Sequence, residues 1–96
     1  MDVAEFGAAI SDETRLRLIE IIHEEGPLTS KEAHAEFVER YEDRRRESIY
    51  KALEKLVDTG LLSKEYKGTE DGLVYTLPHN IVKINLPTRE IRLEKH

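Results

Sequence analysis

The 96-residue chain contains no cysteine, which excludes disulfide bonds, thiolate metal ligands and cysteine nucleophiles. It also lacks any apolar run near the about 18–20 residues that a membrane-spanning helix needs. Its first residues include Asp2 and Glu5 instead of the apolar segment of a secretory signal. We therefore expect a cytoplasmic protein with no membrane partner.

Catalytic and metal-binding patterns are missing as well. The sequence has no glycine-rich phosphate loop, no nucleophile elbow, no triad arrangement and no two histidines four residues apart. The four histidines are scattered along the chain: His23, His34, His79 and His96. Positions on the surface or at helix ends explain such histidines better than a ligand set does. We predict no enzyme activity, no metal and no cofactor.

The charge is distributed unevenly. A net charge of −5 argues, taken alone, against nucleic-acid binding, because contacts to phosphates dominate that affinity. Residues 1–39 hold three basic and ten acidic side chains, whereas residues 40–55 hold six basic and four acidic ones, and residues 56–96 hold six of each. Because the local field decides docking, the segment 40–55 is the candidate for DNA contact.

Apolar spacing predicts a buried helix in the first third of the chain. It is expected to begin at an N-cap formed by Ser11 or Asp12 and to end at about Glu25, before a glycine and a proline. Its apolar side chains are Leu16, Leu18, Ile19, Ile21 and Ile22. Because they cover most of the helix circumference, we expect burial on more than one side.

Capping signals predict two more helices. Thr29 and Glu32 have the spacing of a capping box, in which each side chain satisfies the other residue's free backbone amide. The next helix is predicted over Arg44 to Thr59, with Asp43 as its N-cap and Gly60 as a left-handed stop.

After Gly60 the apolar period changes from about 3.6 to 2, which is the period of a strand. The stretches "LLSKEYK" and "LVYTLP" flank "GTEDG" and predict a β-hairpin. Alternating residues in 81–96 predict a second strand pair or an extended arm. This order predicts a single domain over 1–96 of the α+β class, mainly helical: a winged helix-turn-helix core at 10–78 with a C-terminal β extension at 79–96.

Two stretches carry a family resemblance: "ISDETRLRLIEIIHEEGPLTSKEAHAEF" and "ESIYKALEKLVDTGLLSKEYKGTEDGLVYTLP". They resemble winged-helix repressors of the ArsR type, and they are also similar to TrmB-like and PadR-like regulators. The resemblance covers about Ile10 to Pro78. It implies a homodimeric transcriptional regulator that places the 44–59 helix in the major groove of double-stranded DNA while the hairpin wing touches the adjacent backbone.

The sequence departs from this family in three ways. Metal-sensing members use cysteines, which are absent here, so the chain lacks thiolate metal sensing. Members usually end in a dimerising helix, whereas residues 81–96 alternate like strands. Wings that bind DNA usually have a basic tip, whereas Glu70 and Asp71 stand there. Val3, Phe6 and Ile10 mark a short opening helix. We expect this helix and the C-terminal arm to form a symmetric dimer interface together. The alternative is that both cover the monomer's own core.

On a helical wheel the 44–59 helix has three sides. The apolar side consists of Ile49, Leu53, Leu56 and Val57. A basic, hydroxyl-bearing flank consists of Arg44, Ser48, Lys51 and Lys55, and an acidic flank of Glu47, Glu54 and Asp58. The basic flank has the chemistry to contact phosphates and guanine edges in a groove.

The predicted DNA contacts are Arg44, Arg45, Arg46, Ser48, Tyr50, Lys51, Lys55, Lys64 and Lys67. Arg44 and Arg45 lie near the helix start, where such helices contact DNA. Arg46 falls nearer the core side of the helix. There it is expected to contact the DNA backbone from the edge or to pair with a neighbouring acidic side chain. The hydroxyl of Tyr50 is expected to reach a phosphate of the DNA. Lys64 and Lys67 are expected on the same side of the first wing strand, facing the flanking backbone.

The charge pattern leaves two alternatives to DNA binding. Helix faces of mixed sign are usually only solvated, with pairs such as Glu47–Lys51 contributing little. The acidic N-terminal third and wing tip also fit an acidic winged-helix module that binds a protein instead of DNA. Proteins from salty or hot cells commonly carry an excess of acidic residues. If the chain comes from such a cell, its negative net charge is no argument against DNA binding.

Overall fold

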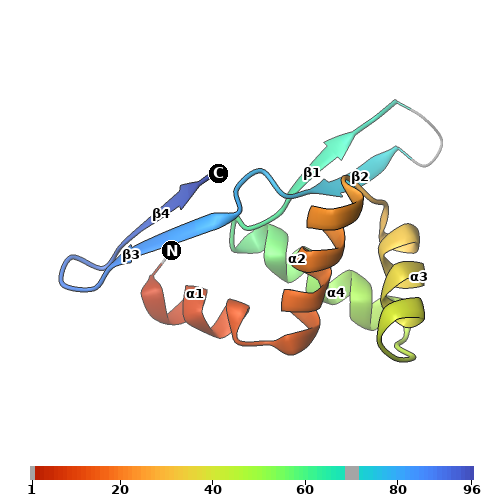
Figure 1. The fold of residues 1–96 in the computed structure, drawn as a ribbon, viewed down its shortest axis with the longest axis horizontal. Helices are drawn as coiled ribbons and strands as arrows, with labels where there is room; N and C mark the ends of the chain where they lie inside the picture. Colours follow the sequence, from red (N-terminus) through yellow and green to blue (C-terminus); the bar gives the residue numbers. More distant parts are fainter. Residues whose placement is uncertain (1, 69–71) are drawn as a thin grey trace.

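The computed structural model describes residues 2–68 and 72–96. Within them, four helices precede two antiparallel hairpins (Figure 1). In chain order they are α1 (Val3–Ile10), α2 (Glu13–Glu25), α3 (Ser30–Arg40), α4 (Arg46–Asp58), β1 (Ser63–Tyr66), β2 (Leu73–Thr76), β3 (Ile81–Asn85) and β4 (Glu90–Glu94). The predicted α+β winged helix-turn-helix fold is confirmed.

Side-chain caps mark where α2 and α3 begin. Asp12, and not Ser11, caps α2, because its Oδ1 accepts a hydrogen bond of 3.0 Å from the backbone N–H of Arg15. The predicted capping box of α3 is confirmed: Thr29 Oγ1 accepts from the N–H of Glu32 at 3.1 Å, and Glu32 Oε1 accepts from the N–H of Thr29 at 2.9 Å. These bonds satisfy amides that a helix start otherwise leaves free.

One hydrophobic core joins α1 through α4 to the first hairpin. Its buried side chains are Phe6, Leu18, Ile21, Ile22, Ala33, Phe37, Ile49, Leu53, Leu56, Leu61, Leu62 and Tyr75. The predicted core stripe of α4 is confirmed, because Ile49, Leu53 and Leu56 are fully buried. The helix α2 is expected to be buried on more than one side; its Leu18, Ile21 and Ile22 are buried, whereas Leu16, expected among the buried residues, is 44% exposed. Within the described ranges, no element covers that side of α2 completely.

The hairpin β1–β2 forms the wing and packs beside α4. Its register pairs Ser63 with Thr76 and Tyr66 with Leu73. A short bridge adds Leu28 to the wing, with the N–H of Tyr75 donating to the carbonyl of Leu28 at 2.7 Å. The expected acidic wing tip, 70–71, lies outside the described residues.

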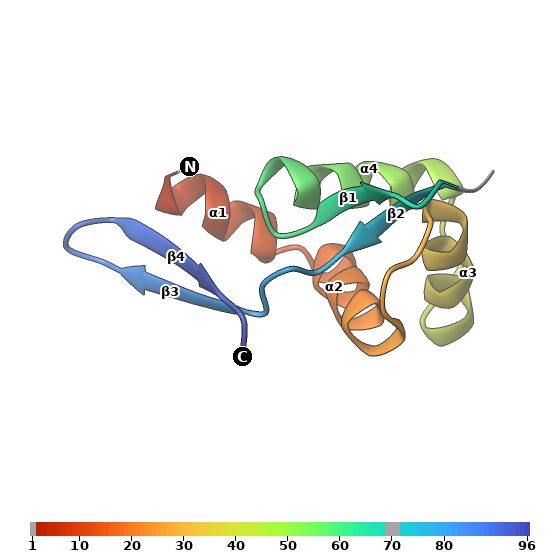
Figure 2. The same ribbon diagram turned by 90° about the horizontal axis from the view of Figure 1, so that it is seen from above.

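The hairpin β3–β4 projects at the opposite end of the molecule from the wing (Figures 1 and 2). This confirms the predicted second strand pair. Its register places Val82 opposite Leu93 and Ile84 opposite Ile91, so one face of the hairpin is apolar. The other face carries Lys83 and Arg92 as neighbours, and Lys83 also pairs with Glu94 at 3.2 Å. The amphipathic hairpin lengthens the molecule to 44 × 30 × 21 Å.

No helix in the described part of the chain has the length and apolar character needed to cross a membrane.

Candidate nucleic-acid interface

The candidate interface is built on α4, which begins two residues later than predicted. The helix starts at Arg46, and Arg45 occupies the N-cap position without a side-chain cap. The prediction of Asp43 as the cap is therefore wrong. The Nε2 atom of His34 contacts the carbonyl oxygen of Arg44 at 2.6 Å, and this contact holds the segment before α4 against α3 in a non-helical path.

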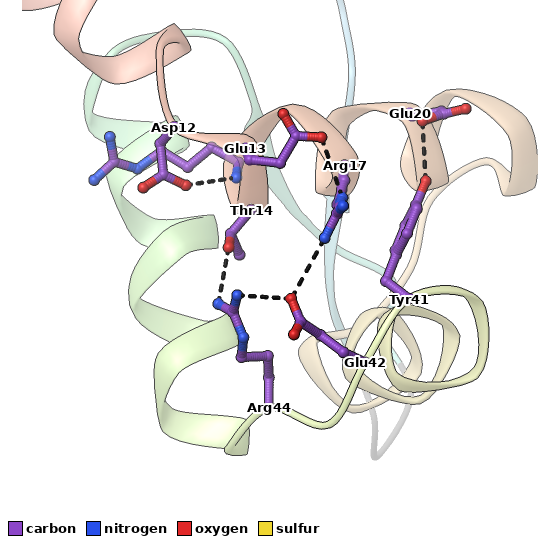
Figure 3. A network of polar contacts seen from close by, with 9 residues as sticks. Asp12, Glu13, Thr14, Arg17, Glu20, Tyr41, Glu42 and Arg44 are labelled. Carbon is purple, nitrogen blue, oxygen red and sulfur yellow. Dashed lines mark hydrogen bonds and ion pairs between the residues drawn. The ribbon is translucent and has the colours of Figure 1, made fainter.

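Arg44 does not join the outward basic flank, so that prediction is wrong as well. It lies before the helix, and its guanidinium turns toward α2 (Figure 3). Nη1 donates to Thr14 Oγ1 at 2.9 Å, Nη2 pairs with Glu42 Oε1 at 3.0 Å, and the guanidinium lies 5.7 Å from the ring centre of Phe37. A helical wheel cannot place a residue that is outside the helix.

Arg44 belongs to a polar network that joins α2 to the end of α3. Arg17 pairs with Glu13 at 3.2 Å and with Glu42 at 3.5 Å (Figure 3), and its guanidinium lies 4.5 Å from the centre of the Tyr41 ring. The Tyr41 hydroxyl donates to Glu20 at 3.0 Å. Partial burial, helped by that bond, raises the pKa of Tyr41. These contacts fix the orientation of the helices that support α4.

Arg40 forms a second clamp between α2 and α3. Its guanidinium contacts Glu24 at 2.6 Å, Glu25 at 2.6 Å and Glu36 at 3.2 Å. The hydrogen bond to Glu24 is the main reason that the pKa of Arg40 is raised above its ordinary value. Arg40 and Arg44 are therefore paired with carboxylates of their own chain, so two of the basic residues of 40–55 are used in contacts within the molecule.

The remaining basic side chains of this segment point to solvent. The exposed basic and hydroxyl-bearing residues of α4 and its cap are Arg45, Arg46, Ser48, Lys51 and Lys55, and Glu47, Tyr50 and Asp58 are exposed as well. Lys51 pairs with Glu47 at 3.1 Å, as predicted, but both side chains are more than 70% exposed. Among residues 2–68 and 72–96, Arg45, Arg46 and Lys55 form no ion pair. Arg46, expected nearer the core, is exposed.

The acidic flank of α4 is divided, because Glu54 faces the wing. Its Oε2 accepts from the Tyr75 hydroxyl at 2.6 Å and its Oε1 pairs with Lys64 Nζ at 2.9 Å. The bonds from Tyr75 and then from Lys64 lower the pKa of Glu54, and Glu54 in turn raises the pKa of Lys64. Tyr50 is 47% exposed on the same side of α4.

The two wing lysines do not share a side of the strand. Lys64 lies opposite Tyr75 within the hairpin and contacts Glu54, whereas Lys67 follows the end of β1 and is exposed. Side chains alternate along a strand, so residues three positions apart belong to opposite faces. The expectation of one common basic side is therefore wrong.

Sequence reasoning missed Thr14 and Arg15, which stand beside the basic flank of α4. Both line a pocket together with Arg44, Ser48 and Lys51. The signal available in the sequence was Arg15, a basic residue in the first turn of a helix that is otherwise acidic at its start. Its relation to α4 depends on helix packing, which one sequence does not specify.

Within the described ranges, no group of three or more histidine, aspartate and glutamate side chains is placed to hold a metal ion.

Comparison with known proteins adds one match. Residues 10–65, more than half of the chain, match the model of a family described as a helix-turn-helix domain. The match runs from the end of α1 through α4 to β1, which is the part of the fold that contains the candidate interface. No curated protein and no solved structure shows a significant match to the chain.

Proposed function

The chain belongs to the helix-turn-helix domain family, and we propose from this premise that it is a sequence-specific DNA-binding transcriptional regulator. The observation that supports the proposal most directly is the outer surface of α4. Arg45, Arg46 and Lys55 are exposed there without an ion pair among the described residues, while Ile49, Leu53 and Leu56 anchor the opposite side in the core. The helix is thus rigidly held and presents its cations to solvent.

In the proposed complex α4 lies in the major groove. A helix with its side chains is about 10–12 Å across, and the groove is about 12 Å wide. Arg45, Arg46 and Lys55 would neutralise phosphates, which supplies affinity without sequence preference. Lys51, nearer the middle of the exposed surface, would contact a base edge, and Ser48, on the side of α4 that faces α2, would contact the backbone. The pair of Lys51 with Glu47 does not prevent this, because so exposed an ion pair is weak.

The wing would contact the backbone beside the groove through Lys67 rather than Lys64. Lys64 is occupied by Glu54 and is only 34% exposed at its side chain. Tyr50, exposed between α4 and the wing, would add a hydroxyl contact to a phosphate on that side.

We further propose that the regulator acts as a homodimer, resembling the ArsR type in its core but dimerising through the β3–β4 hairpin; α1, expected to take part, buries Phe6 in the monomer's own core. Symmetric dimers cover two half-sites one helical turn apart, which doubles a small contact area. The hairpin's apolar face, which includes the 38%-exposed Ile84, supports this arrangement.

A salt titration tests DNA binding. Selection from a pool of random duplexes should yield sequences that the protein binds. Fluorescence anisotropy of the labelled duplexes should then show tighter binding to these sequences than to scrambled versions. The affinity should fall steeply between about 50 and 200 mM salt, with a log–log slope near −0.9 for each phosphate contacted. Absence of binding at the lowest salt would refute the proposal.

A second candidate function follows from the ion pairs. Arg44, Lys51 and Lys64 each contact a carboxylate of their own chain, so the field available to DNA is weaker than the sequence suggests. A winged helix of this kind also fits a protein partner. The same titration separates the two candidates, because a protein-binding module would show no duplex affinity at low salt.

A further inference from the structure

A polar pocket lies where the start of α2 meets α4. It has a volume of about 290 Å³ and is lined by Asp12, Thr14, Arg15, Arg44, Ser48, Lys51 and Ala52. Three of these side chains are cations, two carry hydroxyl groups and one is a carboxylate. Two of the three cations are paired with carboxylates that stand outside the lining, Arg44 with Glu42 and Lys51 with Glu47, so Arg15 is the lining cation without an ion pair in the described ranges.

The hydrogen-bond donors of the pocket are not exhausted by contacts within the protein. Thr14 Oγ1 accepts from Arg44, which leaves the hydroxyl proton of Thr14 available. Arg15 donates through Nη1 to the carbonyls of Ala8 and Ala9 at 3.5 and 3.3 Å, which leaves donors on its other nitrogens.

The carboxylate of the pocket does not pair with its cations. Asp12 Oδ1 accepts from the backbone N–H of Arg15, as the cap of α2. No ion pair in the described ranges involves Arg15. The pocket thus combines the guanidinium of Arg15, unpaired in the described part of the chain, with free N–H and O–H donors, which is the chemistry that binds a phosphate group.

We propose that this pocket binds one backbone phosphodiester of DNA, at the edge of the groove that α4 enters; the inference rests on the proposed function. Ser48 and Lys51 belong both to the pocket and to the exposed surface of α4, so a phosphate held here lies directly beside that helix. Glu54 and the wing stand on the other side of α4. The pocket would therefore hold one strand of the duplex while the wing side faces the other strand.

The test compares the salt dependence of duplex binding for Arg15→Gln and Arg17→Gln. Each variant removes one positive charge from α2, but Arg17 is paired with Glu13 and Glu42 and lies outside the pocket. We expect Arg15→Gln to weaken binding about tenfold and to reduce the log–log salt slope by about one. Arg17→Gln should leave the salt slope unchanged. Arg15→Lys should also show the wild-type slope, because it keeps the positive charge.

Other results would overturn the inference in distinguishable ways. If the wild-type protein binds duplexes and Arg15→Gln weakens binding with an unchanged slope, Arg15 acts by supporting α1 and the phosphate site is refuted. In another outcome, millimolar inorganic phosphate shifts the NMR signals of Arg15 and Thr14 to a plateau while Arg15→Gln leaves the salt slope of duplex binding unchanged. That result would show that the pocket binds a free anion and not DNA. If the wild-type protein binds no duplex, the proposed function itself fails.

Discussion

The carboxylate of Glu54 on α4 accepts a hydrogen bond of 2.6 Å from the hydroxyl of Tyr75 on β2. The same carboxylate pairs with Lys64 on β1 at 2.9 Å, so one side chain of α4 is bound to both strands of the wing. Tyr75 is also buried in the core and linked to Leu28 through the backbone. The wing is therefore fixed to the helix beside it by polar contacts as well as by packing.

This arrangement predicts that stability depends on the ionisation of Glu54. Its pKa is lowered from the ordinary value of 4.5, so folding favours the charged carboxylate. The stabilisation is present above about 4.5 and is lost as the pH falls through the lower pKa of the folded state. We expect the urea midpoint of the wild-type protein to drop between about pH 5 and pH 3 by more than that of Glu54→Gln.

A control for this prediction is Glu65→Gln on the same hairpin, because Glu65 is exposed and has no ion pair among the described residues. Its pH profile should follow that of the wild-type protein. Equal pH profiles for Glu54→Gln and the wild type would show that the contacts of Glu54 contribute nothing to stability. At pH 7, Glu54→Ala should destabilise by about 1–3 kcal/mol, since it leaves the Tyr75 hydroxyl without its partner.

The capping box at the start of α3 gives a second prediction. Thr29→Ala removes the oxygen that accepts from the N–H of Glu32 and is expected to lower the free energy of unfolding by about 1 kcal/mol. Chemical denaturation at neutral pH measures the change. Thr88→Ala, in the exposed turn between β3 and β4, is the matched control and should cost less, because its hydroxyl makes only a 3.4 Å contact. Equal losses would contradict the capping interpretation.

The order of the helices and strands was predictable because local signals determine it. The capping box at Thr29 and Glu32, the core stripe from Ile49 to Leu56 and the hairpin turns all involve residues close together in the sequence. Periodicity and caps therefore predict the winged helix-turn-helix order almost completely.

The details of the candidate interface were not predictable in the same way. Arg44 turns toward Thr14, thirty positions away, and Glu54 contacts Tyr75, twenty-one positions away. A helical wheel assigns a direction to a side chain but not the partner that it meets. The error over Arg44 arose at a helix boundary, where assignment from sequence is least certain, and the contact between His34 and the Arg44 carbonyl decides it.

The DNA-binding surface predicts the effect of charge reversal. Arg45→Glu combined with Lys55→Glu should abolish duplex binding and leave the circular dichroism spectrum and melting temperature close to those of the wild type. Both side chains are exposed and take part in no ion pair in the described ranges, so their loss costs little within the protein. Reversal of Arg44 would be a poorer test, because it would also disrupt contacts to Thr14 and Glu42.

A matched control for charge reversal is Arg92→Glu with Lys95→Glu, two exposed residues without an ion pair in the described ranges, which changes the net charge by the same amount at the other end of the molecule. This control should retain most of the affinity. If both double variants bind equally weakly, the effect comes from net charge, and α4 is not the contact surface.

The apolar face of the β3–β4 hairpin predicts the mode of dimerisation. A two-stranded hairpin is marginal by itself in water, and its register places Val82, Ile84, Ile91 and Leu93 on one side. Ile91 and Leu93 pack against the core, whereas Ile84 is 38% exposed. We expect Ile84→Lys to convert a dimer into a folded monomer, as measured by sedimentation equilibrium. Ile81→Lys, on the polar face of the same strand, is the control and should stay dimeric.

The same variant links dimerisation to DNA binding. If two copies occupy half-sites about 10 base pairs apart, a monomeric Ile84→Lys protein should bind a duplex with two half-sites no more tightly than a duplex with one. The wild-type protein should prefer the two-site duplex strongly and lose that preference when five base pairs are inserted, because the second site then faces the other side of the helix. A wild-type protein that sediments as a monomer at micromolar concentration and ignores half-site spacing would show that the hairpin serves only its own chain.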